Sequence, residues 1–291
     1  MERNEIPGQG ACRIESGFWN RYIGVKRNGV IPYQWDILND RREDAEPSHA
    51  IDNFRIAAGE MEGAFYGQVF QDSDVYKWLE AVGNILMLER DPHLEEQADS
   101  LIDLIVKAQE PDGYLDTYFT IREPDKKWSD LLECHELYCA GHMIEGAIAY
   151  YQATGKEKIY RAACRLADYL TQIFGQEEGK MHGYPGHQEI ELALLKLYEV
   201  SGEEQYLRLA SYFLETRGTN RFFEEEFEKR GRTTFWNGAK IPEPNERYNH
   251  YPYSYYNQFH APVRQQETAV GHAVRAMYMY TAMADLAAKT K

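Results

Sequence analysis

Cysteine and the common catalytic signatures are scarce in this chain of 291 residues. Its 4 cysteines show no Cys-x-x-Cys spacing and no histidine cluster at zinc-finger intervals, so we expect reduced, mostly packed thiols. Gly-rich phosphate loops, a Gly-x-Ser-x-Gly elbow and the His-Glu-x-x-His zinc signature are also missing. The sequence therefore gives no direct signal for a disulfide framework, a nucleotide site, a serine hydrolase or a zinc protease.

Long apolar runs and an excess of positive charge are absent as well. No run approaches the length of a membrane span, and the polar start lacks the features of a secretion signal, so we expect a cytoplasmic protein. The 32 Lys and Arg residues are outnumbered by 47 Asp and Glu, which gives a formal net charge of −15. This charge repels phosphate backbones and anionic surfaces, so neither nucleic acid nor a membrane is an expected partner.

Aromatic residues, by contrast, are abundant. They make up 13% of the chain, with 22 Tyr and 5 Trp. Flat rings beside polar groups suit the binding of sugars, and tyrosine-rich cores or subunit contacts offer a second explanation.

Helical periodicity dominates from Asp74 onward, and no run of alternating strand character competes with it. A unit of helix, tight turn, second helix and glycine-bearing loop recurs three times, with turns at Asp91-Pro92, Thr154-Gly155 and Ser201-Gly202. Helical hairpins repeated in this way close into a ring or stack into a solenoid. We therefore expect an all-α fold in which residues 1–291 form a single domain.

The last predicted helix, roughly Glu267 to Ala288, looks like the first half of a further hairpin. With one or two helices before Asp74 we count about eight or nine, whereas a closed ring of six hairpins needs twelve. The expected fold is therefore an incomplete (α/α)6 toroid. Its uncovered apolar edge predicts self-association.

A long irregular segment is expected between Gly218 and Pro262, where a charged stretch precedes an aromatic one. The tyrosines in the aromatic stretch either form a lid that stacks on sugar rings or pack on the protein surface. They are Tyr251, Tyr253, Tyr255 and Tyr256.

Histidines recur at equivalent points of the repeat. The pairs Gly141-His142, Gly186-His187 and Gly271-His272 each fall at or near the expected start of an inner helix, and His135 opens another such helix. Unpaired amides and the positive end of the helix dipole disfavour an imidazolium there, so the ring stays neutral and can both donate and accept hydrogen bonds. Neutral imidazoles suit the hydroxyls of a sugar, and the alternative is that these histidines only cap or pack the helices.

The carboxylates show no obvious acid and base pair. Glu189 and Glu191 are two positions apart, about 200° around a helix, so they cannot both face one cleft. The same reasoning separates Asp72 from Asp74, and the segment that holds them has the character of an N-cap. Around Tyr114, the sequence Pro-Asp-Gly-Tyr predicts a turn first and a binding site second.

Several motifs together resemble glycoside hydrolase family 127 over nearly the whole chain and in the same order. They are Phe18-Trp19, Ile31-Pro32-Tyr33-Gln34-Trp35, Phe70 to Glu80, Asp112-Gly113-Tyr114-Leu115, His135-Glu136-Leu137-Tyr138, Gly186 to Glu191 and Gly271-His272-Ala273-Val274-Arg275.

The resemblance implies an (α/α)6 catalytic domain that cleaves terminal β-L-arabinofuranosyl residues of arabinose-containing glycans with retention. In that family a zinc-bound cysteine thiolate attacks the anomeric carbon while a glutamic acid protonates the leaving oxygen, and metal binding keeps a thiol deprotonated and nucleophilic. The resemblance also implies that His135, His187 and His272 bind sugar hydroxyls. From the same matched motifs we expect Asp72, Asp74 and Tyr114 to be substrate-binding residues.

One departure from the family limits what can be transferred. The acid/base glutamate, the zinc-binding Glu-x-Cys and the adjacent Cys-Cys pair of the family belong to a later stretch with no counterpart before Lys291. Cys134 and Cys139 cannot replace them, because both fall in a segment that the family uses otherwise. We therefore expect a chain truncated before the zinc and nucleophile region, with no catalytic residue, no metal ligand and no cofactor of its own.

Three hypotheses follow from these observations. In the first, the chain is the sugar-contacting part of an arabinofuranosidase that needs zinc when complete. In the second, it is a non-catalytic carbohydrate-binding or assembly module. In the third, it has another activity of α/α toroids, such as unsaturated-uronyl hydrolysis, with Asp72 or Asp74 as acid or base.

Overall fold

The computed structural model describes residues 15–240, 247–248 and 251–290, and these residues are largely helical. The first part of the chain contains α1 (Gly17–Val25), a π-helical turn (Lys26–Val30), α2 (Ile31–Leu38), α3 (Ala50–Ala57), α4 (Asp72–Leu88), α5 (Pro92–Ala108), α6 (Thr117–Arg122), a 3-10 turn (Pro124–Lys126) and α7 (Glu136–Thr154). The rest contains α8 (Lys158–Ile173), α9 (Ile190–Ser201), α10 (Glu204–Thr216), α11 (Phe222–Lys229), β1 (Arg247–Tyr248), β2 (Tyr251–Pro252), α12 (Tyr253–Tyr256), a 3-10 turn (Val263–Gln265) and α13 (Ala273–Lys289).

These helices belong to two compact units. The first unit comprises Met1–Pro124 and Met143–Leu166, and the second comprises Asp125–His142 and Ala167–Lys291. Helices α7 and α8 therefore contribute residues to both units.

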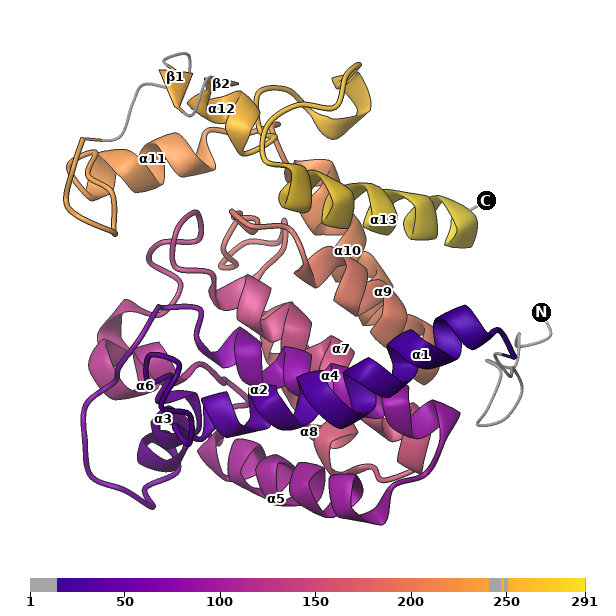
Figure 1. Ribbon diagram of the computed structural model, residues 1–291. Helices are drawn as coiled ribbons and strands as arrows, with labels where there is room; N and C mark the ends of the chain where they lie inside the picture. The colour runs from indigo at the N-terminus through magenta and orange to yellow at the C-terminus, as the bar shows by residue number, and fades with distance from the viewer. Residues whose placement is uncertain (1–14, 241–246, 249–250, 291) are drawn as a thin grey trace. The chain divides into compact units, whose positions relative to one another are not determined.

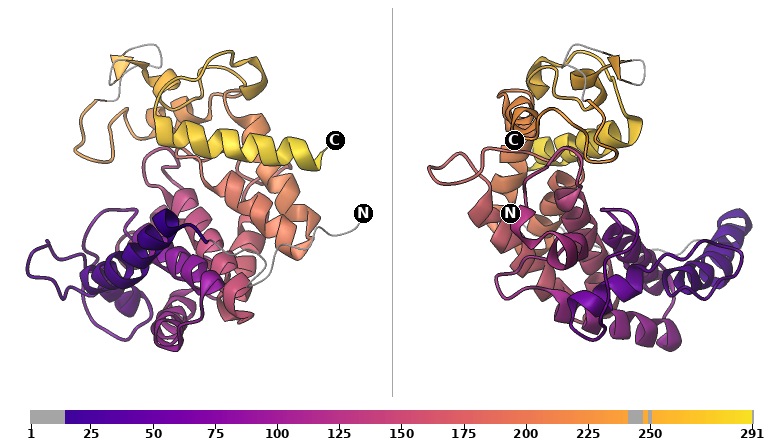
Figure 2. Two further views of the ribbon diagram at one scale, coloured as in Figure 1. Left: turned by 45° about the vertical axis from the view of Figure 1, so that its right-hand side comes forward. Right: turned by 90° about the vertical axis from the view of Figure 1, so that its left-hand side faces the viewer.

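Close helix packing builds the first unit. The buried residues of α4 recur three and four positions apart, as in Val75, Leu79, Val82 and Leu86, so one face of the helix is apolar. A Cβ on Gly83 would lie 2.5 Å from the backbone carbon of a residue in α7. Glycine is thus required where α4 and α7 cross. Figure 2 shows α1 continuing through the π-helical turn into α2.

A helical hairpin and a third helix build the second unit. Helices α9 and α10 pack side by side, and α13 packs on both (Figure 1). Gly202 ends α9 with φ 76°, a left-handed conformation that glycine adopts without steric cost, so the chain reverses there. The antiparallel pair β1 and β2 has two residues in each strand.

The three hairpins predicted from the sequence are confirmed as α4–α5, α7–α8 and α9–α10. Other predictions are corrected: the charged stretch expected to be irregular forms α11, and the last helix begins at Ala273, six residues later than expected. Within residues 15–71, three helices and a π-helical turn precede α4, which is more than the one or two helices expected. In the described part of the chain, no helix is both long and apolar enough to cross a membrane.

Candidate functional site

Three histidines predicted to bind a sugar lie together in the second unit. The ring centroids of His135 and His187 are 5.5 Å apart, and those of His187 and His272 are 5.8 Å apart. The rings thus form a row with His187 in the middle. Although more than 130 residues separate the first from the last, they share one neighbourhood.

His135 directly precedes α7 and has a left-handed backbone, with φ 60°. Its Nδ1 donates a hydrogen bond to the carbonyl oxygen of Glu133. Since a carbonyl can only accept, the proton of the neutral ring lies on Nδ1, and Nε2 is the acceptor. The half-buried ring is held in one tautomer.

His187 is the most enclosed of the three, with 9% of its surface exposed. Its Nδ1 donates to the carbonyl oxygen of Gln188 at 2.8 Å, which again makes Nε2 the acceptor. Burial, with a further contribution from the Arg275 guanidinium, lowers the pKa of His187 to about 2. The ring is therefore neutral at physiological pH.

His272 is the N-cap of α13, and its Nδ1 accepts a hydrogen bond from the backbone N–H of Arg275 at 3.4 Å. Because Nδ1 accepts, the proton of the neutral ring lies on Nε2. Among the three histidines, His272 is therefore the one whose Nε2 can donate a hydrogen bond to a ligand. Desolvation, then the charge of Arg275, lowers the pKa of His272. The row therefore offers two acceptor nitrogens and one donor nitrogen, a combination suited to sugar hydroxyls.

Close contacts between loops hold the histidines together. The N–H of Gly186 donates to the carbonyl oxygen of Leu131 at 2.9 Å, and a Cβ on Gly186 would lie 2.2 Å from the carbonyl oxygen of Leu132. The loop before His187 therefore packs on the loop before His135 at a distance that only glycine permits.

Arg275 ties the third histidine to this pair. Its buried guanidinium donates to the carbonyl oxygen of Gly186 at 3.3 Å and to the side chain of Asn257. The same residue donates its backbone N–H to His272. One side chain thus links the start of α13 to the loop that carries His187.

Two further aromatic rings join the row, and neither was among the predicted substrate-binding residues. Tyr138 lies 4.5 Å from both His187 and His142, and Tyr256 lies 5.6 Å from His272, measured between ring centroids. Tyr138 follows His135 by three positions on α7, and this spacing was an available signal. Of the tyrosines considered for a lid, Tyr256 contacts the row through His272. The side chain of Tyr251 is outside the described part of the structure.

The prediction that all three Gly-His pairs lie at or near the start of an inner helix is wrong for Gly141-His142. His142 lies in the second turn of α7, not at its start, where His135 takes the expected place. Gly141 serves packing instead, since a Cβ there would lie 2.7 Å from the side chain of Glu189. His142 is buried with its Nδ1 3.6 Å from Glu189.

Glu189 and Glu191 face different partners, as their spacing predicts. Glu189 lies beside His142, whereas Glu191 pairs with Arg217 at 3.5 Å. Both carboxylates are buried, and burial raises the pKa of Glu191. The two residues do not form an acid and base pair in one cleft.

The other predicted substrate-binding residues lie in the first unit. Asp72 is buried in the first turn of α4, and its carboxylate accepts hydrogen bonds from the N–H and hydroxyl of Thr117. Its expected N-cap role is therefore wrong, because the side chain joins α4 to the start of α6 instead. Asp74 is exposed, and Tyr114 is buried in a turn where its N–H donates to Asp112. Contact of Asp72, Asp74 and Tyr114 with a sugar stays a prediction.

The described cysteines do not fit a zinc-bound thiolate. Cys134 is buried, and its burial beside Asp130 and Glu136 raises the pKa of the thiol. Cys139 is completely buried as well. Within residues 15–240, 247–248 and 251–290, no group of side chains with metal-ligand spacing includes a cysteine.

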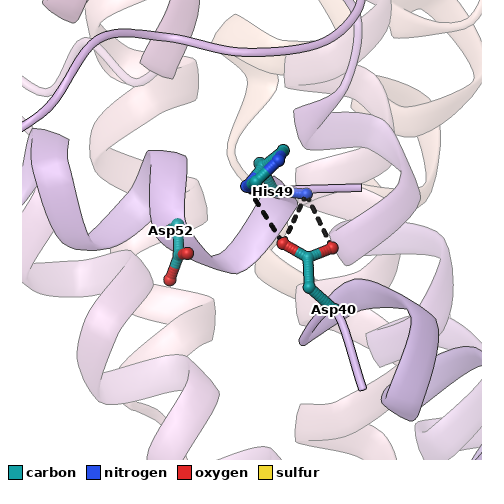
Figure 3. Close-up of side chains that lie close together, drawn as sticks. All are labelled: Asp40, His49 and Asp52. Carbon is teal, nitrogen blue, oxygen red and sulfur yellow. Dashed lines mark hydrogen bonds and ion pairs between the residues drawn. The ribbon is translucent and has the colours of Figure 1, made fainter. Parts of the chain in front are cut away.

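Asp40, His49 and Asp52 offer ligand atoms within 4.8 Å of one another (Figure 3). Their contacts are structural. The carboxylate of Asp40 accepts the N–H groups of Ser48 and His49 and so fixes the turn before α3, while Asp52 pairs with Arg55 at 2.7 Å. The group thus organises a turn.

Comparison with known proteins finds close relatives of this chain. The chain is 41% identical over 290 residues to a non-reducing end β-L-arabinofuranosidase from Bifidobacterium longum subsp. longum, covering 93% of this chain and 42% of the relative. A crystal structure of a β-L-arabinofuranosidase from Geobacillus stearothermophilus T6 matches with 58% identity and a TM-score of 0.87, covering 95% of this chain and 42% of that one. A second solved β-arabinofuranosidase matches with 33% identity and a TM-score of 0.79, covering 96% of this chain and 39% of that one.

These matches confirm the predicted fold class, the all-α toroid of helical hairpins. The chain spans less than half the length of these relatives. Over residues 11–291 it matches the β-L-arabinofuranosidase catalytic domain of glycoside hydrolase family 127, and it belongs to that family.

Proposed function

We propose that this chain binds the terminal β-L-arabinofuranosyl residue of arabinose-containing glycans through His135, His187 and His272. It serves as the sugar-contacting part of a glycosidase that cleaves this residue with retention. The observation that carries the proposal is the row of three imidazoles, whose ring centroids lie 5.5 and 5.8 Å apart.

The chemistry of the row supports a neutral polyhydroxylated ligand. A sugar hydroxyl both donates and accepts, so it pairs with the acceptor nitrogens of His135 and His187 and the donor nitrogen of His272. Hydrogen bonds made in a partly desolvated site discriminate strongly against ligands that lack the matching hydroxyl. The relatives at 41% and 58% identity are β-L-arabinofuranosidases, which supports arabinofuranose as the sugar.

A calorimetric titration with methyl β-L-arabinofuranoside tests the proposal. We expect binding by the wild type and a loss of about tenfold or more in affinity for His187→Ala, because one well-placed hydrogen bond in a desolvated site disappears. His182→Ala is the matched control, since His182 is an exposed histidine of the same unit. Equal affinities of the wild type and His187→Ala would contradict the proposal.

A release assay on an aryl β-L-arabinofuranoside separates the proposed enzyme role from a carbohydrate-binding module. For this chain alone we expect binding of the sugar without release of the aryl group, because the buried thiols of Cys134 and Cys139 do not fit the family's zinc-bound nucleophile. Release that depends on His187 would overturn the expected inactivity of the chain. The binding module would be favoured if the chain binds the sugar but no aryl group is released after a partner polypeptide is added.

We also propose self-association through the apolar side chains exposed on α13. Val274 and Met277 are 50% and 55% exposed and lie three positions apart, on neighbouring parts of the helix surface. Sedimentation velocity should show a concentration-dependent species that Met277→Glu weakens. A single monomeric species for the wild type at all concentrations would refute this proposal.

A further inference from the structure

Trp236 lies beside His135, one of the outer rings of the histidine row. Its ring centroid lies 6.2 Å from that of His135, with the two planes at 67°, and 43% of the residue is exposed. An exposed tryptophan beside hydrogen-bonding imidazoles combines an apolar face with polar groups. Sugar rings bind to such surfaces, because their C–H faces stack on the aromatic ring while their hydroxyls find polar partners.

The turn that carries Trp236 is closed by its own hydrogen bonds. Thr234 donates its N–H to the carbonyl oxygen of Ala239 at 2.8 Å, and the N–H of Gly238 donates back to Thr234 at 3.0 Å. The N–H of Trp236 donates to the hydroxyl of Thr234 at 3.3 Å. Because these bonds fix the backbone on both sides, the indole is presented by a defined turn.

Glu133 fastens this turn to the loop of His135. Its carboxylate accepts the hydroxyl of Thr234 at 2.7 Å and the N–H of Phe235 at 2.8 Å. The carbonyl oxygen of the same residue accepts Nδ1 of His135. One residue therefore fixes the orientation of the imidazole through its backbone and the place of the indole through its side chain.

Arg230 forms an ion pair with the carboxylate of Glu133. Its guanidinium lies 3.3 Å from the Glu133 carboxylate and also pairs with Asp130. Asp130 in turn accepts the N–H of Glu133 at 3.0 Å. This network of charges lies at the base of the turn, where it restricts movement of Glu133.

We propose that Trp236 stacks on the sugar unit attached to the terminal arabinofuranosyl residue, and that Glu133 is the residue that positions it. The inference rests on the proposed function, since it takes the three histidines as the site of the terminal sugar. It adds a determinant of preference for the neighbouring unit.

The order of the rings assigns Trp236 to this second unit. A sugar that contacts all three imidazoles must lie over His187, the middle ring of the row. Trp236 lies beside His135, which is one of the two outer rings of the row. A ring stacked on the indole is therefore next to the terminal sugar, where the second unit of an oligosaccharide extends.

Two ligands distinguish the subsites: methyl β-L-arabinofuranoside, which has one sugar, and a disaccharide of two L-arabinofuranosyl units. In calorimetry we expect the wild type to bind the disaccharide about tenfold more tightly than the methyl glycoside. Trp236→Ala should abolish this preference and change the affinity for the methyl glycoside by less than about twofold. Trp236→Phe keeps an aromatic face and should retain most of the preference.

Glu133→Gln tests positioning with the same pair of ligands. It should reduce the disaccharide preference while leaving the affinity for the methyl glycoside within about twofold, because the backbone bond to His135 remains. A general loss of structure would weaken both ligands equally, and that result would overturn the positioning role.

Fluorine NMR of the wild type labelled with 5-fluorotryptophan observes ligand binding in the unaltered chain. The Trp236 resonance, assigned by its absence from Trp236→Phe, should shift with the disaccharide and not with the methyl glycoside. Nitrogen NMR of the imidazoles follows the histidines in the same titration. If the disaccharide shifts the histidine resonances but not the Trp236 resonance, the role of Trp236 is refuted while the proposed function stands. If neither ligand moves the histidine resonances, the proposed function fails instead.

Discussion

At the scale of single residues, the neutral state of His187 is the property on which its predicted contact with a sugar depends. Desolvation lowers its pKa to about 2, whereas an unfolded chain has a histidine pKa of about 6.5. The unfolded chain therefore binds a proton that the folded chain does not as pH falls below about 6.5. The contribution of His187 to the free energy of unfolding therefore decreases as pH falls from about 6.5 towards about 2.

This state predicts the titration of the His187 ring. Carbon and nitrogen NMR of the labelled imidazole should show no protonation between about pH 8 and 4.5 in the folded chain. The same residue in urea should titrate near pH 6.5. A protonation step near pH 6.5 in the folded chain would show that the ring is hydrated and would remove the basis for its neutral role.

Asp72 has the opposite dependence on pH. Burial raises its pKa to about 6 despite the hydrogen bonds from Thr117. Because the folded pKa lies above the unfolded value, Asp72 adds stability below about pH 4, and this contribution is lost as pH rises through about 6. The stability of the wild type relative to Asp72→Asn should therefore decrease by up to about 3 kcal/mol between pH 4 and pH 7.

Urea denaturation at several pH values measures this difference. Identical pH dependence in the wild type and Asp72→Asn would contradict the buried, ionising carboxylate. The double variant Asp72→Asn, Asp74→Asn also tests the third hypothesis of the sequence analysis. Retained activity of an assembled enzyme would eliminate these residues as acid and base.

At the scale of secondary-structure elements, the site depends on loops that approach each other more closely than side chains allow. Gly186 is the point of contact between the loops that carry His135 and His187. Gly186→Ala would bring its Cβ to 2.2 Å from the carbonyl oxygen of Leu132, so the two loops must separate. We expect a loss of about 3 kcal/mol in the free energy of unfolding, together with weaker sugar binding.

Gly24→Ala provides the matched control for this change. Gly24 lies in α1, and a Cβ there meets no atom within 4 Å. Alanine in a helix interior should keep or raise the stability by about 0.5–1 kcal/mol. Wild-type stability and binding in Gly186→Ala would contradict the close approach of the loops.

At the scale of the whole molecule, repeated turns and periodic apolar residues were sufficient to predict the fold. Each hairpin turn has its own local signal, such as the left-handed glycines Gly155 and Gly202, with φ 74° and 76°. Helix α11 was missed because charge dominates its sequence, although Phe223 and Phe227 are buried four positions apart. That spacing was a helical signal within a stretch interpreted as a loop.

The candidate site was predictable only in part. Three of its imidazoles stand at or near helix starts, which a repeat makes visible. The bond between Glu133 and Phe235 joins residues 102 positions apart, and no local pattern encodes it. Long-range contacts of this kind determine which aromatic ring faces the histidines, so Trp236 was not found from the sequence.

A crystal structure of the chain with methyl β-L-arabinofuranoside tests the central claim most directly. It should show a single sugar hydrogen-bonded to Nε2 of His135, His187 and His272. A sugar bound elsewhere, for example in the 440 Å³ cavity lined by Phe174, Arg208 and Tyr212, would contradict the account.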